Sequence, residues 1–539
     1  MAHPLGIYVA QINSKMGHIS GNAEKILSHW QQGRDANADV VVMPECAICG
    51  YPPEDLLFKR SFVDACMEAV KTLADETLKG PALLVGTPWR AEGFLFNTAV
   101  LIKNGQINTI ACKQELPNYG VFDEQRYFQA GMGSSICKIG EVTVGLAVCE
   151  DLWFPPVAKQ LEQKGAEVIL ALNASPFDMK KLKTRTEIVR YRADETQLPI
   201  LYVNAIGGQD ELVFDGHSFA QNPNETAPAF MAAGFEEDAF MATFQNSTLT
   251  TQANLPAASD GLDALDAALC CGVRDYVHGN GFKEVVIGLS GGIDSALAAA
   301  LAVRSLGADS VTGLLMPSPY SSVHSLEDAE KLAENLGIKT HTVPIDPGMK
   351  AFDTMLGGIF KDTTEDVTEE NIQARVRGAL LMAYSNKFGG MLLSTGNKSE
   401  LSVGYSTLYG DMNGGFNPLK DLYKTTVFEL CKHLNKDAEI IPENIISKPP
   451  SAELRPNQLD SDTLPDYDTL DTILKQAIEE HKSVDEIAQA GIDKQMAEKI
   501  MRMLRLAEYK RRQACPGVKV SHVAFGRDFR FPITNSWRV

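Results

Sequence analysis

The sequence of 539 residues lacks the features that would mark a membrane, secreted or nucleic-acid-binding protein. It contains no apolar run near the roughly 18 residues that suggest a membrane span. Its first residues, MAHPLGIYVAQINSKMG, lack the basic start and long apolar core of a signal peptide. Basic residues are outnumbered, since 50 Lys and Arg stand against 69 Asp and Glu and leave a formal net charge of −19. We therefore expect a cytoplasmic protein that binds neither nucleic acid nor membranes.

Cysteine is also scarce for a chain of this length. Ten cysteines do not make a disulfide framework, so a reducing compartment is the default expectation. Cys46 and Cys49 form a CxxC pair, but no second pair or nearby histidine completes a zinc set. A metal or redox role is one alternative for this pair, and we favour two packed thiols beside an active site. Cys270 and Cys271 lie in a helical pattern and are expected in the core.

The sequence does contain two different architectures in succession. Up to about residue 245, short β-rich runs recur with helical stretches between some of them, and Asn104-Gly105 suggests a hairpin turn. The runs are GIYVAQIN, ADVVVMPE, ALLVGTP, NTAVLI, TVGLAVCED, AEVILALNAS and LPILYVNAIG. We predict a layered α/β domain over 1–245, followed by a polar linker over 246–262.

The second half, 263–539, alternates strands with helices. LDALDAALCCGVRDYVHGNG has helical spacing, and EVVIGLSGGIDSALAAALAVRSLG predicts a strand, a tight turn and a helix. SVTGLLMP, SLEDAEKLAENLG and KTHTVPI continue as strand, helix and strand. This alternation predicts a doubly wound, Rossmann-like parallel sheet with helices on both faces.

The stretch SGGIDS (290–295) lies where a strand ends and a helix begins. Its glycines let the backbone approach an anion, while the helix N-terminus and the serine hydroxyls supply hydrogen-bond donors. It lacks the lysine of the GxxxxGK[ST] loop. A plain glycine turn with a serine cap is the alternative, but the length of the motif and its flanking elements favour a phosphate-binding loop.

The SGGIDS loop resembles that of the N-type ATP pyrophosphatases, which adenylate a substrate and release pyrophosphate. Three further stretches resemble signatures of the NAD synthetase family, and the resemblance covers nearly the whole second half. They are NIQARVRG (371–378), STGNKSELSVGYSTLYGDMNGGFNPLKDLYKT (394–425) and KRRQACPG (510–517). Cys515 departs from the family pattern, in which a proline is expected at this position.

The resemblance implies sites for ATP, Mg²⁺ and deamido-NAD. The implied ATP contacts are Gly288, Leu289, Ser290, Gly291, Gly292, Ile293, Asp294, Ser295, Thr395 and Lys424. Asp294 and Glu400 would supply carboxylates to Mg²⁺, which prefers oxygen ligands and substrate phosphates. Asn371, Glu400 and Lys510 would contact the dinucleotide. From charge alone, the basic cluster that begins at Lys510 would instead be a solvated helix face.

An adenylated carboxylate needs a nucleophile, and the first half offers a source of one. Glu45, Lys113 and Cys149 each lie at or just past the end of a β-like run, so a layered sheet could bring them together. They resemble the Glu-Lys-Cys triad of the nitrilase superfamily, whose fold is an α-β-β-α sandwich. KQELPNY (113–119) is similar to the glutaminase domains attached to NAD synthetases. A single cysteine is more often an inert core thiol, but three members in the family's order favour a nucleophile.

This second resemblance implies a role for each residue. Cys149 would attack the carboxamide of glutamine, Lys113 would stabilise the thiolate and then the oxyanion, and Glu45 would act as general base. Further glutamine contacts would be Tyr119, Glu124, Ser175 and Lys181, with Glu124 orienting Lys113. Glu150 and Asp151 follow the cysteine directly and oppose its thiolate unless they are paired elsewhere.

The two halves together imply a glutamine-dependent NAD synthetase. Glutamine hydrolysis through a thioester on Cys149 would release ammonia, which would convert an adenylate of deamido-NAD into NAD. Because ammonium is not nucleophilic, we expect an internal passage that keeps ammonia neutral. The family also implies a homodimer or a larger homo-oligomer. The alternatives are a GMP-synthetase-like ligase, whose glutaminase has a different fold, and a catalytically inactive scaffold.

Overall fold

The computed structural model describes residues 4–456 and 458–537, which form two compact units, Met1–Ala264 and Leu265–Val539. They are called here the N-terminal unit and the C-terminal unit. The segment predicted as a linker is partly regular, because β15 (Thr248–Thr251) and α5 (Gly261–Gly279) leave only 252–260 between them without strand or helix. Among the described residues, no helix combines the length and the apolarity needed to cross a bilayer.

The N-terminal unit contains two large β-sheets, and each of the seven predicted runs overlaps one of their strands. The first sheet has the order β15, β14 (Asp238–Gln245), β1 (Leu5–Gln11), β2 (Val40–Val42), β3 (Ala82–Ala91), β4 (Phe94–Lys103), β5 (Gln106–Cys112). The second has the order β13 (Phe230–Met231), β12 (Phe219–Gln221), β9 (Ile200–Asn204), β8 (Val168–Asn173), β7 (Val142–Val148), β6 (Ser135–Ile139). A two-stranded ribbon pairs β10 (Ile206–Gln209) with β11 (Leu212–Asp215).

Side chains alternate between the two faces of each strand, which explains why the two large sheets pack face to face. Val40 and Val42 of β2 lie in one buried cluster with Leu146 and Val148 of β7, whereas Val41 points to the opposite side. Successive side chains of a strand point to opposite faces, so each sheet presents a second apolar face that helices must cover. Four helices do so: α1 (Ile19–Asp35), α2 (Arg60–Glu76), α3 (Pro155–Gln163) and α4 (Lys181–Thr196).

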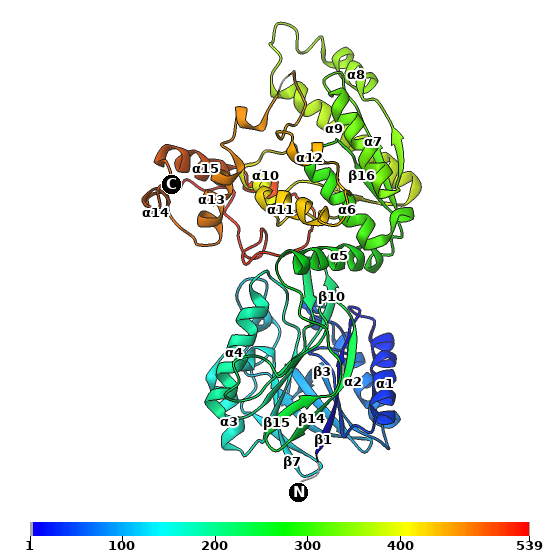
Figure 1. Cartoon of the computed structure of the whole chain (residues 1–539), viewed down its shortest axis with the longest axis vertical. Helices are drawn as coiled ribbons and strands as arrows, with labels where there is room; N and C mark the ends of the chain where they lie inside the picture. The colour runs from blue at the N-terminus through cyan, green and yellow to red at the C-terminus, as the bar shows by residue number, and fades with distance from the viewer. Residues whose placement is uncertain (1–3, 457, 538–539) are drawn as a thin grey trace. The chain divides into compact units, whose positions relative to one another are not determined.

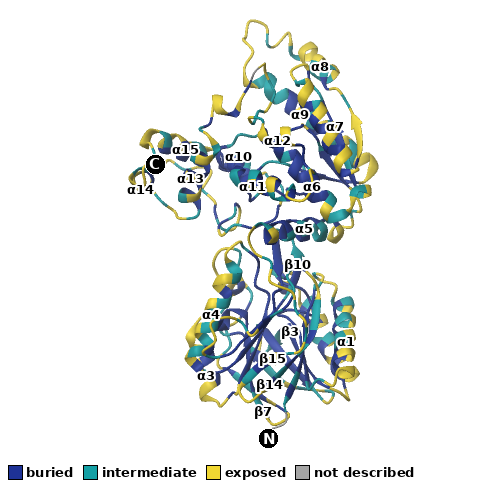
Figure 2. Ribbon diagram, in the orientation of Figure 1, coloured by how far each residue is buried: buried dark blue, intermediate teal, exposed yellow. Residues whose placement is uncertain are grey.

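The helices lie outside the two sheets, with α1 on one side and α3 and α4 on the other (Figure 1). α1 and α2 share a core with the outer face of the first sheet, and α3 and α4 share one with the outer face of the second. Exposed residues are concentrated on the outward helix faces and the strands between them are buried (Figure 2). The predicted α-β-β-α sandwich is therefore confirmed.

The hairpin predicted at Asn104-Gly105 joins β4 to β5. Lys103 pairs with Gln106 across the turn, and the two residues between them have φ of 52° and 75°. A two-residue turn with positive φ at both positions matches the right-handed twist of the flanking strands. This turn sends β5 back along β4, so that its last residue leads directly to Lys113.

The C-terminal unit has a four-stranded parallel sheet in the order β18 (Lys339–Thr342), β17 (Val311–Leu315), β16 (Val285–Gly288), β19 (Met391–Leu393). α6 (Ile293–Leu306) and α9 (Val367–Phe388) both pack against β16. Besides α5, the other helices are α7 (Val323–Leu336), α8 (Asp346–Leu356), α10 (Lys398–Val403), α11 (Lys424–Leu434), α12 (Glu443–Ser447), α13 (Tyr467–Ile478), α14 (Val484–Gln489), α15 (Lys494–Leu506) and α16 (Glu508–Arg511). The predicted parallel-sheet α/β class is confirmed.

Candidate active sites

Three strand ends bring Glu45, Lys113 and Cys149 together in the N-terminal unit. Glu45 follows β2 and Lys113 follows β5 in the first sheet, whereas Cys149 follows β7 in the second. All three side chains are buried. The Lys113 Nζ atom lies 2.8 Å from Glu45 Oε1, and the Cys149 thiol interacts electrostatically with both side chains.

The chain turns sharply at two points of this site. Cys149 has φ of 46°, a left-handed conformation uncommon outside glycine, where β7 runs into the 3₁₀ turn Cys149–Leu152. Glu45 lies close to β3, where a Cβ on Gly86 would come within 2.4 Å of the Cys46 nitrogen and 2.6 Å of the Pro44 oxygen. Glycine is therefore needed at 86 for this close approach.

The two acids after Cys149 are both paired. Asp151 accepts hydrogen bonds from three backbone N–H groups, one at the end of β7 at 2.9 Å and two after Lys113 at 2.9 and 3.0 Å. Burial raises the pKa of Asp151 to about 6, although these N–H groups oppose the shift. Glu150 accepts a hydrogen bond of 2.8 Å from the Tyr119 hydroxyl, and burial raises its pKa. The Asp151 carboxylate thus anchors the turn that carries the cysteine.

Two glutamates share the ammonium group of Lys113. Its Nζ donates to Glu45 Oε1 at 2.8 Å and to Glu124 Oε1 at 2.7 Å. Burial alone would lower the pKa of Lys113, but Glu124 and Glu45 outweigh it and hold that pKa well above the usual value. Burial raises the pKa of Glu124 to about 7, against the attraction of Lys113. The lysine therefore stays charged within a buried cluster.

The resting thiol of Cys149 keeps its proton. Burial raises its pKa well above the usual value, Glu45 adds to the shift, and Lys113 only partly opposes it. The expected offset by Lys113 is present but does not prevail in the free enzyme. A thiol of this kind becomes nucleophilic when its proton passes to a neighbouring base during the reaction. Glu45 is the base predicted for this step, and that role stays a prediction.

The four predicted glutamine contacts lie near the cluster of Lys113 and Cys149 to different degrees. Glu124 is buried against Lys113, Ser175 is buried just after β8, and Tyr119 is half exposed beside Glu150. Lys181 begins α4, and its Nζ lies 4.2 Å from the ring centre of Trp153. Burial lowers the pKa of Lys181, although Asp178 opposes the shift. Whether these four side chains hold glutamine stays a prediction.

Sequence reasoning missed side chains that hold Glu45 and Glu124 in place. Asn97 donates to Glu45 Oε1 at 2.7 Å, and the Ala174 backbone N–H donates to Glu45 Oε2 at 2.9 Å. The Tyr51 hydroxyl donates to Glu124 Oε1 at 2.8 Å. Asn97 opens the quoted run NTAVLI and Tyr51 lies in no quoted stretch, and nothing in their local sequence marks either as part of a site.

In the C-terminal unit, the SGGIDS loop joins β16 to α6. Gly291 has φ of 75°, and a Cβ there would come within 2.1 Å of the Ser325 carbonyl oxygen, so only glycine fits. The Ser295 hydroxyl donates to the Gly292 oxygen at 2.9 Å, and the Ser290 hydroxyl accepts from the Gly292 N–H at 3.2 Å. The loop is thus closed by its own serines.

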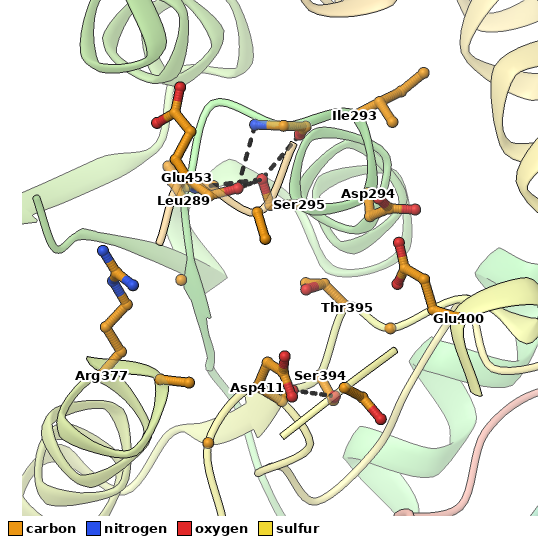
Figure 3. A pocket seen from close by; sticks show the side chains of 18 of the residues that line it. Leu289, Ile293, Asp294, Ser295, Arg377, Ser394, Thr395, Glu400, Asp411 and Glu453 are labelled. Carbon is orange, nitrogen blue, oxygen red and sulfur yellow. Dashed lines mark hydrogen bonds between the residues drawn. The ribbon is translucent and has the colours of Figure 1, made fainter. Parts of the chain in front are cut away.

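A cavity of about 340 Å³ opens beside this loop (Figure 3). Asp294 and Glu400 lie on one side of it and Arg377 on the other. Of the predicted ATP contacts, nine line the cavity: Gly288, Leu289, Ser290, Gly292, Ile293, Asp294, Ser295, Thr395 and Lys424. Gly291 is outside the lining and faces Ser325 instead. The cavity size suits a small-molecule ligand.

Asp294 and Glu400 share one ammonium group. The Lys424 Nζ donates to Asp294 Oδ2 and, at 3.1 Å, to Glu400 Oε1, while Asn397 donates to Asp294 Oδ1 at 2.9 Å. Burial raises the pKa of Glu400 to about 8, Lys424 opposes this, and Asp294 adds to it. The pKa of Lys424 is raised because the two carboxylates outweigh burial.

This donor set fits Mg²⁺. An ammonium that bridges two carboxylates shows that the position favours a cation, and carboxylate oxygens are ligands that Mg²⁺ prefers. Within the described ranges, no group of three His, Cys, Asp or Glu side chains forms a fuller metal site. The Mg²⁺ assignment to Asp294 and Glu400 stays a prediction.

Asn371 and Lys510 lie outside the lining of the cavity. Asn371 accepts a hydrogen bond of 2.8 Å from the Thr407 hydroxyl. The Lys510 Nζ donates to the carbonyl oxygens of Gly404 and Ser406 at 2.7 and 2.6 Å, at the end of α10. Burial lowers the pKa of Lys510. Their predicted contacts with the dinucleotide stay untested by this geometry.

Several cavity residues were missed from the sequence. Arg377 lies within NIQARVRG and Asp411 within the 394–425 stretch, so both motifs contained a signal that was not used. Glu453 accepts hydrogen bonds from Ser322 at 2.9 Å and from Ser325 at 2.8 Å, and no motif marks it. Cys515, which replaces the expected proline, also lines the cavity.

Fold and sites together define a two-part enzyme: a carbon-nitrogen hydrolase unit followed by an ATP-using synthase unit. The family model for carbon-nitrogen hydrolases matches residues 7–251, and the model for NAD synthase matches residues 266–514. The second match decides against a GMP-synthetase-like ligase.

Full-length relatives identify the combination. The chain is 45% identical to the glutamine-dependent NAD(+) synthetase of Synechocystis sp., over 98% of this chain and 99% of that one. It is 44% identical to the enzyme of Rhodobacter capsulatus, over 99% and 98%. The structure of the Acinetobacter baumannii enzyme, solved with adenosine diphosphate, matches with a TM-score of 0.80 at 40% identity and covers 99% of both chains. That of Cytophaga hutchinsonii shares the fold, with a TM-score of 0.85 at 21% identity over 99% and 98%.

This chain belongs to the glutamine-dependent NAD(+) synthetase family. The resemblance drawn from the sequence motifs is confirmed, as is the enzyme class, a ligase. The family assignment covers the whole chain. The roles of individual residues, the domain boundaries, the oligomeric state and the compartment stay predictions.

Proposed function

We propose that this chain makes NAD from deamido-NAD, ATP and glutamine, with one reaction centre in each unit. The observation that supports the proposal is the presence of both arrangements in one chain. The N-terminal unit holds a buried thiol beside a shared Glu–Lys–Glu cluster, and the C-terminal unit holds a phosphate-type loop on a cavity. A scaffold without activity would have no need for both arrangements.

In the N-terminal unit, glutamine is hydrolysed in two steps. Glu45 takes the proton of the Cys149 thiol as sulfur attacks the carboxamide carbon, and the ammonium of Lys113 faces the oxygen that becomes negative. Collapse of this intermediate expels ammonia, which takes up the proton held by Glu45, and leaves a thioester. Glu45 then takes a proton from water, whose oxygen attacks the thioester. As the C–S bond breaks, Glu45 returns this proton to sulfur, so that glutamate is released and the free thiol is restored. Lys181 and Glu150 carry opposite charges near the thiol, suited to the carboxylate and ammonium of an amino acid.

In the C-terminal unit, the loop 288–295 and the N-terminus of α6 receive the phosphates of ATP. The nicotinate carboxylate of deamido-NAD attacks the α-phosphorus, pyrophosphate leaves, and an adenylate forms. Ammonia attacks the activated carbon, AMP leaves, and one proton is released. Mg²⁺ held with Asp294 and Glu400 would neutralise charge on the phosphates. Lys424 keeps these two carboxylates together in the ligand-free state.

Ammonia must reach the adenylate as neutral NH₃, since ammonium has no free electron pair. We propose that it is transferred without release to bulk water. Competition tests this: an ammonia-scavenging enzyme added in excess should leave glutamine-dependent synthesis nearly unchanged. Complete loss of NAD formation in the presence of the scavenger would show that ammonia escapes.

The deciding experiment measures NAD formation from deamido-NAD, ATP and Mg²⁺ with glutamine or ammonium, in the wild type and in Cys149→Ala. The wild type should use both nitrogen sources and the variant only ammonium. If neither protein forms NAD while the wild type hydrolyses glutamine, the proposed acceptor is wrong. Light scattering at working concentration checks the expected homodimer or larger homo-oligomer, and a monomeric mass contradicts it.

A further inference from the structure

Residues 173–175, named here the β8 exit segment, reach both functional parts of the glutaminase centre. The Ala174 backbone N–H donates to Glu45 Oε2 at 2.9 Å, and the Glu45 N–H lies 3.4 Å from the Asn173 oxygen. The next residue, Ser175, is a predicted glutamine contact. One tripeptide thus orients the general base and carries a substrate-binding side chain.

Asn204 holds this segment from the neighbouring strand. It ends β9, pairs in register with Asn173 of β8, and has no exposed surface. Its Oδ1 accepts a hydrogen bond of 2.9 Å from the Ser175 N–H. Its Nδ2 donates to the Gly216 oxygen at 2.9 Å and lies 3.4 Å from the Ser175 oxygen. Both ends of the amide are therefore used, so its orientation is fixed.

A buried ion pair lies behind Asn204. The Arg185 Nη2 atom is 2.6 Å from Asp215 Oδ2, and Arg185 Nη1 is 3.5 Å from the Ser175 oxygen. Asp215 Oδ1 is 3.3 Å from Asn204 Nδ2, and His217 Nδ1 is 3.1 Å from Asp215 Oδ2. The Ser175 backbone is therefore contacted by two side chains of this network, Asn204 and Arg185.

The energetics argue that this network serves more than stability. Burying two charges costs several kcal/mol per ion before their attraction is counted, and a well-packed apolar pair often does as well. Arg185 and Asp215 are nonetheless almost fully buried. Arg185 contacts the Ser175 backbone directly, and Asp215 contacts Asn204, which in turn bonds the Ser175 backbone. Rigid support behind a reactive centre is what keeps its groups in productive geometry.

We propose that Asn204, supported by the Arg185–Asp215 pair, positions the β8 exit segment and thereby sets both the orientation of Glu45 and the place of Ser175. The three residues act through Ala174 and Ser175, so they are positioning residues. The inference rests on the proposed roles of Glu45 and Ser175 in glutamine hydrolysis.

The test compares Asn204→Ala with Asn222→Ala, a matched control. Asn222 is buried in the same unit, and its side-chain amide likewise bonds backbone groups at both ends, accepting from the Leu249 N–H at 2.8 Å and donating to the Leu249 carbonyl at 3.1 Å. We expect Asn204→Ala to lower kcat for glutamine hydrolysis and raise the glutamine KM, each by about tenfold, because small displacements of reacting groups are costly. Ammonium-dependent NAD formation should change less than about twofold in either variant, and so should glutamine hydrolysis in Asn222→Ala.

A double-mutant cycle separates positioning from general stability. Adding Asn204→Ala to Ser175→Ala should raise the glutamine KM little further, because the side chain that Asn204 places is already gone. Should Asn204→Ala fold poorly, the double variant Arg185→Gln/Asp215→Asn removes both charges at once and leaves no unpaired buried ion. It should lower kcat/KM for glutamine by about tenfold or more.

The inference fails if Asn204→Ala matches Asn222→Ala in kcat and KM, if the increases in glutamine KM multiply fully in the cycle, or if the charge-free double variant hydrolyses glutamine normally. These outcomes are distinct from failure of the proposed function. That failure would appear as glutamine-dependent synthesis that survives Cys149→Ala, whereas the present inference fails while Cys149 remains essential.

Discussion

The side-chain nitrogen of Lys113 lies 2.8 Å from a carboxylate oxygen of Glu45, and both side chains are buried. Replacement by methionine would leave Glu45 and Glu124 without their shared counter-charge. We expect Lys113→Met to lower glutamine hydrolysis by about 10³-fold and to destabilise the protein by roughly 3 kcal/mol. Glutamate release and urea unfolding check both effects, and hydrolysis within tenfold of the wild type would contradict the role of Lys113.

Glu124 predicts a pH dependence of glutamine hydrolysis. Its pKa is raised to about 7, so it gains a proton as the pH falls through that value. The neutral acid forms a weaker hydrogen bond to Lys113 than the carboxylate does, and Lys113 is then held less firmly. We expect kcat/KM for glutamine to fall below about pH 7. In Glu124→Gln this limb should be absent and the activity lower throughout, as a pH profile of both proteins would show.

Replacement of Asp294 should stop NAD formation and spare glutamine hydrolysis. Replacement of Cys149 should do the reverse, because it removes glutamine hydrolysis and spares NAD formation from ammonium. Asp294→Asn weakens the pairing with Lys424 and removes a charge from the predicted Mg²⁺ position. We expect NAD formation to fall by more than about 10²-fold with either nitrogen source, while glutamine hydrolysis persists. Glutamate and NAD are measured in the same reaction. A variant that still makes NAD from ammonium would contradict the placement of ATP at this cavity.

Gly291 should tolerate no side chain. A Cβ there would come within 2.1 Å of a backbone oxygen at Ser325, and its φ of 75° adds strain. We expect Gly291→Ala to abolish ATP-dependent NAD formation and leave glutamine hydrolysis in place. Gly292→Ala is the comparison, because its Cβ would meet only the Ser290 hydroxyl, at 3.2 Å, and it should lose less activity. Equal losses would show that the clash is not the cause.

Asp215 predicts loss of stability in acid. Burial opposes ionisation, but Arg185 and His217 outweigh it and lower the pKa of Asp215 from 3.8 to about 2. A carboxyl with a lowered folded-state pKa stabilises the fold above its unfolded value and loses this contribution as the pH falls through the folded value. We expect about 2 kcal/mol to be lost between about pH 4 and pH 2. Urea unfolding across this range checks it, and Arg185→Gln/Asp215→Asn should show a smaller loss.

Seven strands of the N-terminal unit could be read from the sequence because their apolar runs are continuous or alternate locally. The Asn104-Gly105 turn was equally local, since its backbone needs residues that accept positive φ. The two-residue β13 (Phe230–Met231) gives no periodicity to read, and its place is set by pairing with β12. The position of such a short edge strand is set by its pairing with the neighbouring strand of the sheet.

The sequence determined the two α/β architectures and the residue types at each centre, because patterning and loop motifs are properties of neighbouring residues. Tertiary structure decided which groups meet. Ala174 orients Glu45 across 129 residues, and Lys424 bridges Asp294 and Glu400 across 130 and 24. It also brought the two backbone N–H groups after Lys113 to Asp151 and placed Asn204 behind Ser175. Such contacts depend on burial and on strand ends that converge in space, and no local pattern in the chain specifies them.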